Sequence, residues 1–113
     1  ISLFSNVEVG EELTLMKGSR DTLIERAGRV ASSAIKTSDL HADDIAGALV
    51  IYCAGCMLTV QDAMDQVSDG INSALGGAPY LGVFTFGEQG CFLGGENRHG
   101  NLMISIVTFA NGN

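Results

Sequence analysis

The alternation of apolar and polar residues along the chain predicts four extended segments. Residues 1–17 are expected to be extended, because the leucines of ELTLMKG alternate with polar neighbours as in a strand with one buried face. The continuous apolar runs at 46–53 and 80–86 have the length and composition of strands that are covered on both faces. A further apolar run at 102–109 predicts the last strand.

Two segments between these strands have the residue spacing of helices. Over 20–36 the apolar positions form one stripe at helical spacing, and Ser19 is a suitable N-cap. Gly28 inside this helix costs about 1 kcal/mol relative to alanine, so we expect it to mark a close packing contact. The stripe over 59–75 predicts the second helix, which opens on a T-x-x-D pattern resembling a capping box and ends at GGAP.

The resulting order, β-α-β-α-β-β, predicts an α+β fold with a mixed sheet and two main helices. A strand, a returning helix and a second strand usually form a parallel pair with a right-handed crossover. The carboxyl ends of strands 46–53 and 80–86 should then share one rim of the sheet, where ligands collect in such folds. CAGC at 53–56 and the glycine-rich loop 87–101 would lie there together, beside the anion-favouring N-terminus of helix 59–75.

Composition and charge narrow the class of protein. With 113 residues, of which 46% are apolar and 17% charged, the chain suits a single folded domain over 1–113. A net charge of −7 disfavours nucleic acid and anionic membranes as partners, and no apolar run reaches the roughly 20 residues of a membrane span. Three cysteines and the lack of a secretory signal pattern indicate a reducing, cytoplasmic setting. The chain opens on Ile1 rather than methionine, which leaves open that it is a fragment of a longer protein.

The cysteines allow two kinds of chemistry besides simple packing. Cys53 and Cys56 have the C-x-x-C spacing of a redox pair, which would need a lowered thiol pKa. Together with Cys91 and His99 they would also make a Cys₃His zinc site, although zinc ligands usually come in two close pairs. The alternative to both is that the thiols are buried and unreactive, as free cysteines often are.

A carboxylate among glycines is the other candidate for chemistry. Glu88 comes just after the strand 80–86 and stands between Gly87 and Gly90, where the backbone can come close. It could hold a ligand amine, or it could only accept hydrogen bonds from nearby backbone amides. Asn97 and His99, just before the last strand, are likewise either ligand contacts or turn residues.

Several of these segments together resemble one known family. GALVIYCAGC, GVFTFGEQGCF and GENRHGNLMISIV are similar to the C-terminal half of the FIST family, the F-box and intracellular signal-transduction sensory domain. The resemblance implies a sensory module that binds a small ligand, with an amino acid as the candidate, and that is not an enzyme and needs no cofactor. Carried onto this chain, the implied ligand-binding residues are Cys53, Gly55, Thr85, Gly87, Glu88, Gly90, Asn97 and His99.

The resemblance also implies partners, and this chain departs from the family in one position. An N-terminal half of the family and a signalling output domain or partner are expected beside this chain. Cys56 stands where an arginine is expected, so a cation that could pair with Glu88 or with a ligand carboxylate is missing there. A zwitterionic amino acid would place its amine toward Glu88 and its carboxylate toward the helix N-terminus near Thr59. The apolar strand 102–109 could also pair edge to edge in a homodimer.

Overall fold

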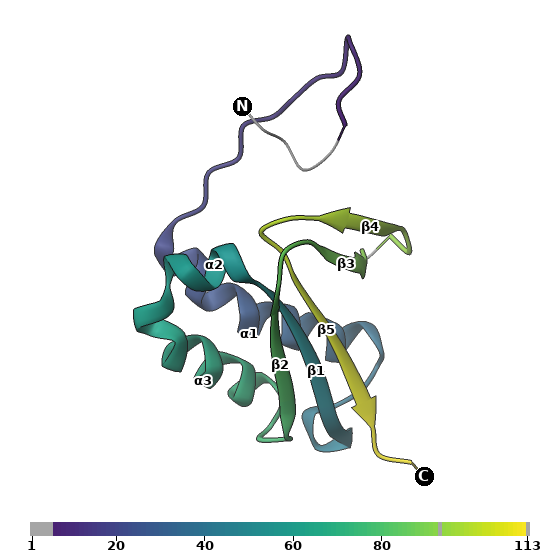
Figure 1. Cartoon of the computed structure of the whole chain (residues 1–113). Coiled ribbons are helices and arrows are strands. Elements are labelled where there is room, and N and C mark those ends of the chain that lie inside the picture. The colour runs from purple at the N-terminus through teal and green to yellow at the C-terminus, as the bar shows by residue number, and fades with distance from the viewer. Residues whose placement is uncertain (1–5, 93, 113) are drawn as a thin grey trace.

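The computed structural model describes residues 6–92 and 94–112, and it confirms the α+β class with a mixed sheet. The sheet has the order β2-β1-β5, with β1 (Ile45–Cys53) in the centre. Strand β2 (Tyr80–Thr85) runs parallel to β1, and β5 (Ile104–Ala110) runs antiparallel to it (Figure 1). The parallel pairing expected for the two apolar runs is therefore confirmed.

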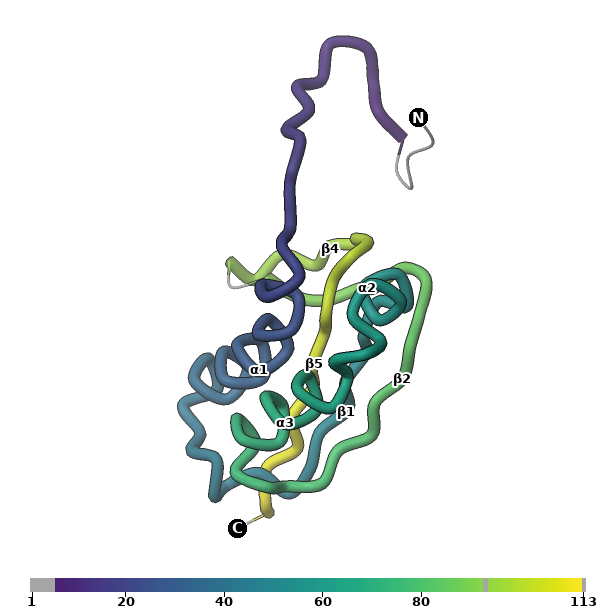
Figure 2. The backbone as a smooth tube through the Cα atoms, turned by 90° about the vertical axis from the view of Figure 1, so that its left-hand side faces the viewer, coloured from purple at the N-terminus to yellow at the C-terminus, as the bar shows by residue number. Residues whose placement is uncertain are grey.

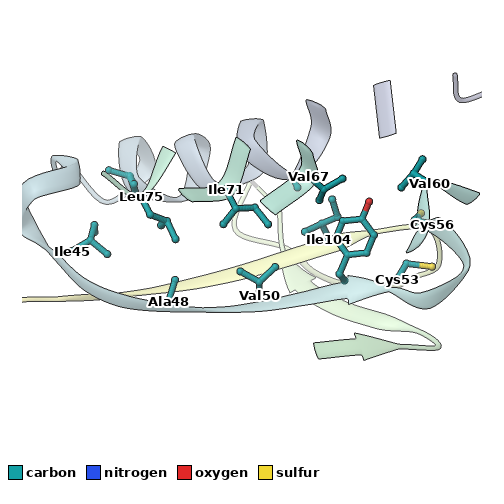
Figure 3. Close-up of a cluster of buried hydrophobic side chains, with 14 residues drawn as sticks. Ile45, Ala48, Val50, Cys53, Cys56, Val60, Val67, Ile71, Leu75 and Ile104 are labelled. Carbon is teal, nitrogen blue, oxygen red and sulfur yellow. The ribbon is translucent and has the colours of Figure 1, made fainter. Parts of the chain in front are cut away.

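The two main helices lie side by side on one face of this sheet (Figure 2). Helix α1 (Arg20–Thr37) begins at the expected N-cap, because the Thr22 amide donates to Ser19 Oγ at 3.2 Å. Helix α3 (Met64–Ala74) packs beside it. The core fills the space between the helices and the sheet (Figure 3) and includes Ala27, Ala31, Ile35, Val50, Val60, Val67, Ile71, Leu75 and Ile104. The other face of the sheet is covered by no helix within the described part of the chain, and most of β2 is exposed. The expectation that the strands at 46–53 and 80–86 are covered on both faces is therefore wrong.

A glycine pair brings α1 and α3 close together. A Cβ added to Gly28 would lie 2.8 Å from the carbonyl oxygen of Gly70, closer than side chains approach backbone. The contact is asymmetric, because a Cβ on Gly70 would meet Gly28 at an ordinary 3.8 Å. The expected close packing contact at Gly28 is confirmed, and it explains why a poor helix former stands inside α1.

The first expected strand, at 1–17, is not formed over residues 6–17, and its residues 1–5 lie outside the described residues. Residues 6–19 pair with no strand and extend away from the body of the domain (Figures 1 and 2). Leu13 and Leu15, which would face a core if the strand were paired, are exposed. Period-two alternation reports only that a segment suits a sheet, and no neighbouring strand is present here to receive it.

The second expected helix begins earlier and is interrupted. Helix α2 (Ala54–Thr59) follows β1 directly, and a 3₁₀ turn at Gln61–Ala63 separates it from α3. The T-x-x-D pattern does not form a capping box. Instead Thr59 Oγ1 donates to the Gly55 carbonyl at 2.9 Å, and both oxygens of Asp62 accept from Arg20 of α1 at 2.8 Å.

The glycine-rich stretch expected to be a loop contains a hairpin. Strand β3 (Glu88–Cys91) pairs antiparallel with β4 (Asn97–Gly100), so that Glu88 lies opposite Gly100 and Cys91 opposite Asn97. These strands lack apolar alternation, so their pairing rests on backbone hydrogen bonds and was not visible in the pattern of hydrophobicity.

No helix within residues 6–92 and 94–112 is both long and apolar enough to cross a membrane.

Candidate functional site

The carboxyl ends of the two parallel strands meet at one rim, as expected. Cys53, the last residue of β1, is in register with Thr85, the last residue of β2. From this rim β1 continues into α2 and β2 continues through Gly87 into β3 (Figure 1). Segments about thirty residues apart in the sequence are therefore neighbours at the rim.

Glu88 lies beneath the rim rather than on its surface. Its side chain is 1% exposed, and each carboxylate oxygen accepts one hydrogen bond. Thr85 Oγ1 donates to Oε1 at 2.9 Å, and the Met103 amide donates to Oε2 at 3.2 Å. Because a carboxylate has about four acceptor positions, these bonds use about half of its capacity. Glu88 thus fastens the start of β3 to the end of β2 and to the segment that leads into β5.

Arg26 of α1 places its positively charged guanidinium at the same segment, just before β5, that Glu88 binds. Arg26 Nη1 donates to the Leu102 carbonyl at 2.6 Å, and Leu102 has a φ of +57°, in the left-handed region that non-glycine residues rarely adopt. The Leu102 carbonyl and the Met103 amide belong to one peptide group, and their bonds point in opposite directions. This peptide group therefore stands between the guanidinium of Arg26 and the carboxylate of Glu88.

Sequence reasoning missed Arg26 because it looked for a cation next to the C-x-x-C segment. A sign of its placement was available in the helical pattern. Arg26 stands three residues after Leu23 and four before Val30, so it borders the apolar stripe of its helix. In the structure its side chain is half-buried.

The two cysteines of the C-x-x-C segment are buried and unpaired. Cys56 is 2% exposed; burial, and after it the neighbouring Cys53 thiol, raises the pKa of Cys56 to about 11. Redox thiols need the opposite, a lowered pKa and access to solvent. The arrangement therefore favours the packing interpretation of these residues over the redox pair.

Titration of Cys56 is expected to make the protein less stable at high pH. The thiol ionises near its ordinary pKa of 9.0 when the chain is unfolded but only near 11 when it is folded. Between these values the unfolded chain binds fewer protons, so the free energy of unfolding should fall by up to about 2 kcal/mol as the pH rises. Urea unfolding at pH 8, 9 and 10.5 would measure this fall in the free energy of unfolding.

Matched cysteine variants test the origin of that pH dependence. Cys56→Ala should show a shallower decline, whereas Cys91→Ala, which changes an exposed residue, should keep the wild-type slope. The burial of Tyr52 raises the pKa of its hydroxyl, which also lowers the stability of the folded protein at high pH. This contribution is present in the wild type and in both cysteine variants. An unchanged slope in Cys56→Ala would contradict the assignment.

The four residues of the zinc alternative are not gathered together. Cys91 is exposed and lies at the far end of the β3–β4 hairpin, opposite Asn97. Within residues 6–92 and 94–112, no group of three or more His, Cys, Asp or Glu side chains is placed to hold a metal ion. The described residues thus offer no Cys₃His centre.

The structure brings most of the implied ligand-binding residues to the rim. A Cβ on Gly55 would lie 3.6 Å from Cys53 Sγ, and one on Gly87, whose φ is +102°, would lie 3.0 Å from His99 Cε1. With Cys53 beside Thr85 and Thr85 bonded to Glu88, six of the eight residues are neighbours. The six are Cys53, Gly55, Thr85, Gly87, Glu88 and His99.

The remaining two residues lie along the hairpin. Gly90 approaches β5, where its added Cβ would meet Ser105 Oγ at 2.8 Å. Asn97 pairs with Cys91, three residues from Glu88 along β3, or about 10 Å at the rise of a strand. Asn97 is thus separated from the group around Glu88, and Gly90 approaches β5.

Comparison with known families decides the class of the protein. The model of the FIST C domain matches residues 1–91, a large majority of the chain. The chain belongs to the FIST C domain family. The resemblance expected from the sequence is confirmed, and with it the assignment to a family of sensory domains in signal transduction.

The part that matches the FIST C domain model includes α1, β1, α2, α3, β2 and β3, and ends at Cys91. Most of the rim, including Glu88 and Arg26, therefore falls inside it. The NRHGN stretch and β5 follow after it. Comparisons with curated proteins and with solved structures gave no match.

Proposed function

We propose that this FIST C domain binds a small ligand at the rim and that the ligand is a free amino acid. The observation that carries the proposal is the Leu102–Met103 peptide group between Arg26 and Glu88. It presents a carbonyl oxygen to the cation and an N–H to the anion. A zwitterionic amino acid offers the same pair, a carboxylate for Arg26 and an ammonium group for Glu88.

The ligand would replace bonds that have one charged partner by bonds between two opposite charges. Arg26 and Glu88 already form charge-assisted bonds to the peptide group, and a zwitterion would add direct Coulomb attraction to both. In addition, Leu102 would leave its left-handed conformation, which costs a non-glycine residue about 1 kcal/mol or more. Binding would therefore move the segment 101–103 at the start of β5. Because β5 pairs with β1 along its whole length, this movement would reach the centre of the sheet.

This arrangement differs from the one expected from the sequence. Thr59 ends α2 and does not begin a helix, so no helix N-terminus receives the ligand carboxylate there. Arg26 takes that role in the proposal, and Glu88 keeps the role given to it. The missing arginine at the position of Cys56 is then compensated by a residue of α1.

A panel of the twenty amino acids, titrated in a thermal-shift assay, tests this function. A ligand that binds only the folded state raises the melting temperature of the protein, and the rise grows with the ligand concentration. Replacing Arg26 by glutamine should weaken the binding of that ligand roughly 10- to 100-fold, which corresponds to the free energy of one lost hydrogen bond to a charged group. Arg29→Gln is the control, because Arg29 is exposed and its nearest acid is Glu25 at 3.6 Å.

The experiment should be run on this chain alone and joined to an N-terminal half of the family. The absence of an amino-acid-dependent shift in both forms would contradict the proposal, and so would equal affinities of the Arg26 and Arg29 variants.

We propose further that the domain is cytoplasmic, is not an enzyme, and acts beside an N-terminal half and a signalling output domain or partner. Pairing of the edge strand β5 in a homodimer belongs to the same proposal.

A further inference from the structure

The arm that precedes α1, residues 6–19, has the alternation of a strand but pairs with no strand in the described structure. Within it Leu13 is 66% exposed and Leu15 is 97% exposed, and polar residues alternate with them. The match to the FIST C domain starts at residue 1, so the arm is part of the domain and not a linker that leads into it. Burial of the two leucines would favour a position in which the arm packs against the domain.

The sheet offers a free edge at β5. This strand pairs with β1 along one side, and its other side pairs with no strand within residues 6–92 and 94–112. Over Ile104–Ala110 the strand contains no charged residue and no proline, which are the usual devices that prevent the addition of a strand at an edge. The edge of β5 is thus open to a further strand.

The handedness of the chain places the arm at this edge and not at β2. Strand β1, helix α3 and strand β2 form a right-handed crossover, since α3 lies in front of the sheet in Figure 2 and β2 lies to the right of β1. Helix α1 lies on the same face and leads from the arm to β1. Such crossovers are right-handed in nearly all proteins, so a parallel strand before α1 must lie on the other side of β1 from β2. That position is beyond β5.

The flank of α1 on this side is apolar and only half covered. Gly28 marks the side of α1 that touches α3. At 3.6 residues per turn, Leu23 and Val30 lie about 140–160° away from Gly28 around the helix axis. Both are half-buried, as is Ile106 on the helix-facing side of β5. A strand beside β5 would bring its inward side chains to these three residues.

We propose that the segment 11–16 docks on the free edge of β5 as a fourth strand of the sheet, and that the structure shows the arm before docking. The segment would run antiparallel to β5, because it would be parallel to β1. Leu13 and Leu15 would face the flank of α1, and Thr14 would face the uncovered side of the sheet. Residues 17–19 would form the turn into α1, a usual length for a connection between a strand and a helix.

A docked arm would occupy the edge that the proposed homodimer uses. One edge of a strand accepts one further strand, so docking within the chain and pairing of β5 with a second copy exclude each other. The arm would therefore act as an autoinhibitory strap, which keeps β5 covered until it is released.

Amide hydrogen exchange of the full chain, followed by NMR, tests the docking. Every second amide over residues 11–16 should exchange at least about tenfold more slowly than in an unstructured chain, because alternate residues of an edge strand bond to the neighbouring strand. Exchange at the unstructured rate throughout the segment would overturn the proposal. Protection that appears only at concentrations at which the protein is a dimer would also overturn it, because the arm would then pair with a second copy.

Two neighbouring residues of the arm provide matched variants. Leu15 and Met16 are 97% and 83% exposed in the undocked arm, but they would face opposite sides of a docked strand. Leu15→Ser should reduce the protection of the arm roughly tenfold or more, because the burial of a leucine is lost. Met16→Ser should reduce it by less than about threefold. Equal effects of the two substitutions would overturn the proposal.

Neither substitution should unfold the domain, because both side chains are exposed in the undocked arm. Neither changes Arg26 or Glu88, so the docking of the arm and the amino-acid proposal can fail separately.

Discussion

Replacing Glu88 with alanine should lower the free energy of unfolding by about 3 kcal/mol. The change removes both hydrogen bonds to a buried carboxylate and leaves the Met103 amide without its acceptor. A hydrogen bond to a charged group contributes about 1.5–3 kcal/mol, and an unpaired buried donor costs about as much again in the least favourable case. For a domain of this size the melting temperature should fall by roughly 10–20 °C.

Two further variants separate this effect from a general loss of acidic residues. Glu96→Ala removes a surface carboxylate that pairs with Arg98, and such exposed pairs contribute about 1 kcal/mol at most. Glu88→Gln keeps the volume and one acceptor oxygen, so its stability should fall between wild type and Glu88→Ala. If Glu88→Ala were no less stable than Glu96→Ala, the carboxylate would not anchor β3 and β5 as described.

The glycine pair between α1 and α3 should give substitutions of opposite sign. Gly28→Ala places a Cβ 2.8 Å from backbone of α3, so the helices must separate, and the protein should lose about 2 kcal/mol of stability. Gly70→Ala finds ordinary contacts at 3.8 Å and should gain up to about 1 kcal/mol from its better helix propensity. Urea unfolding of both variants measures the difference.

The same substitution at two facing positions is its own control, because composition and helix propensity change equally in both. Propensity alone predicts that both variants become more stable. Stabilisation by Gly28→Ala would therefore show that the two helices do not approach as closely as the structure has them.

Features of the fold that depend on local pattern could be predicted from the sequence. The apolar runs at β1 and β2 marked the two strands, and the order of elements implied their parallel pairing. They did not show that β2 would be an exposed edge strand. Ser19 was recognisable as an N-cap because capping chemistry acts over three residues. Gly28 was recognisable as a packing contact because glycine destabilises a helix, so a glycine inside one suggests that a larger side chain would not fit there.

Features that depend on long-range pairing could not be predicted in this way. The segment 6–19 has the pattern of a strand, but pattern does not supply a neighbouring strand. The hairpin of β3 and β4 forms without apolar alternation. At the site, the pattern marked Glu88 and the thiols, whereas Arg26 is brought to Leu102 across seventy-six positions, a distance that only the tertiary structure reveals.

The order of strands in the sheet has a consequence for synthesis of the chain. The central strand β1 is made first, and its two neighbours follow about thirty and sixty positions later. Until β5 has left the ribosome, β1 exposes one row of unpaired backbone groups, and Glu88 lacks its bond to Met103. Cotranslational folding should therefore finish late, with the closing step made by the final strand of the sheet.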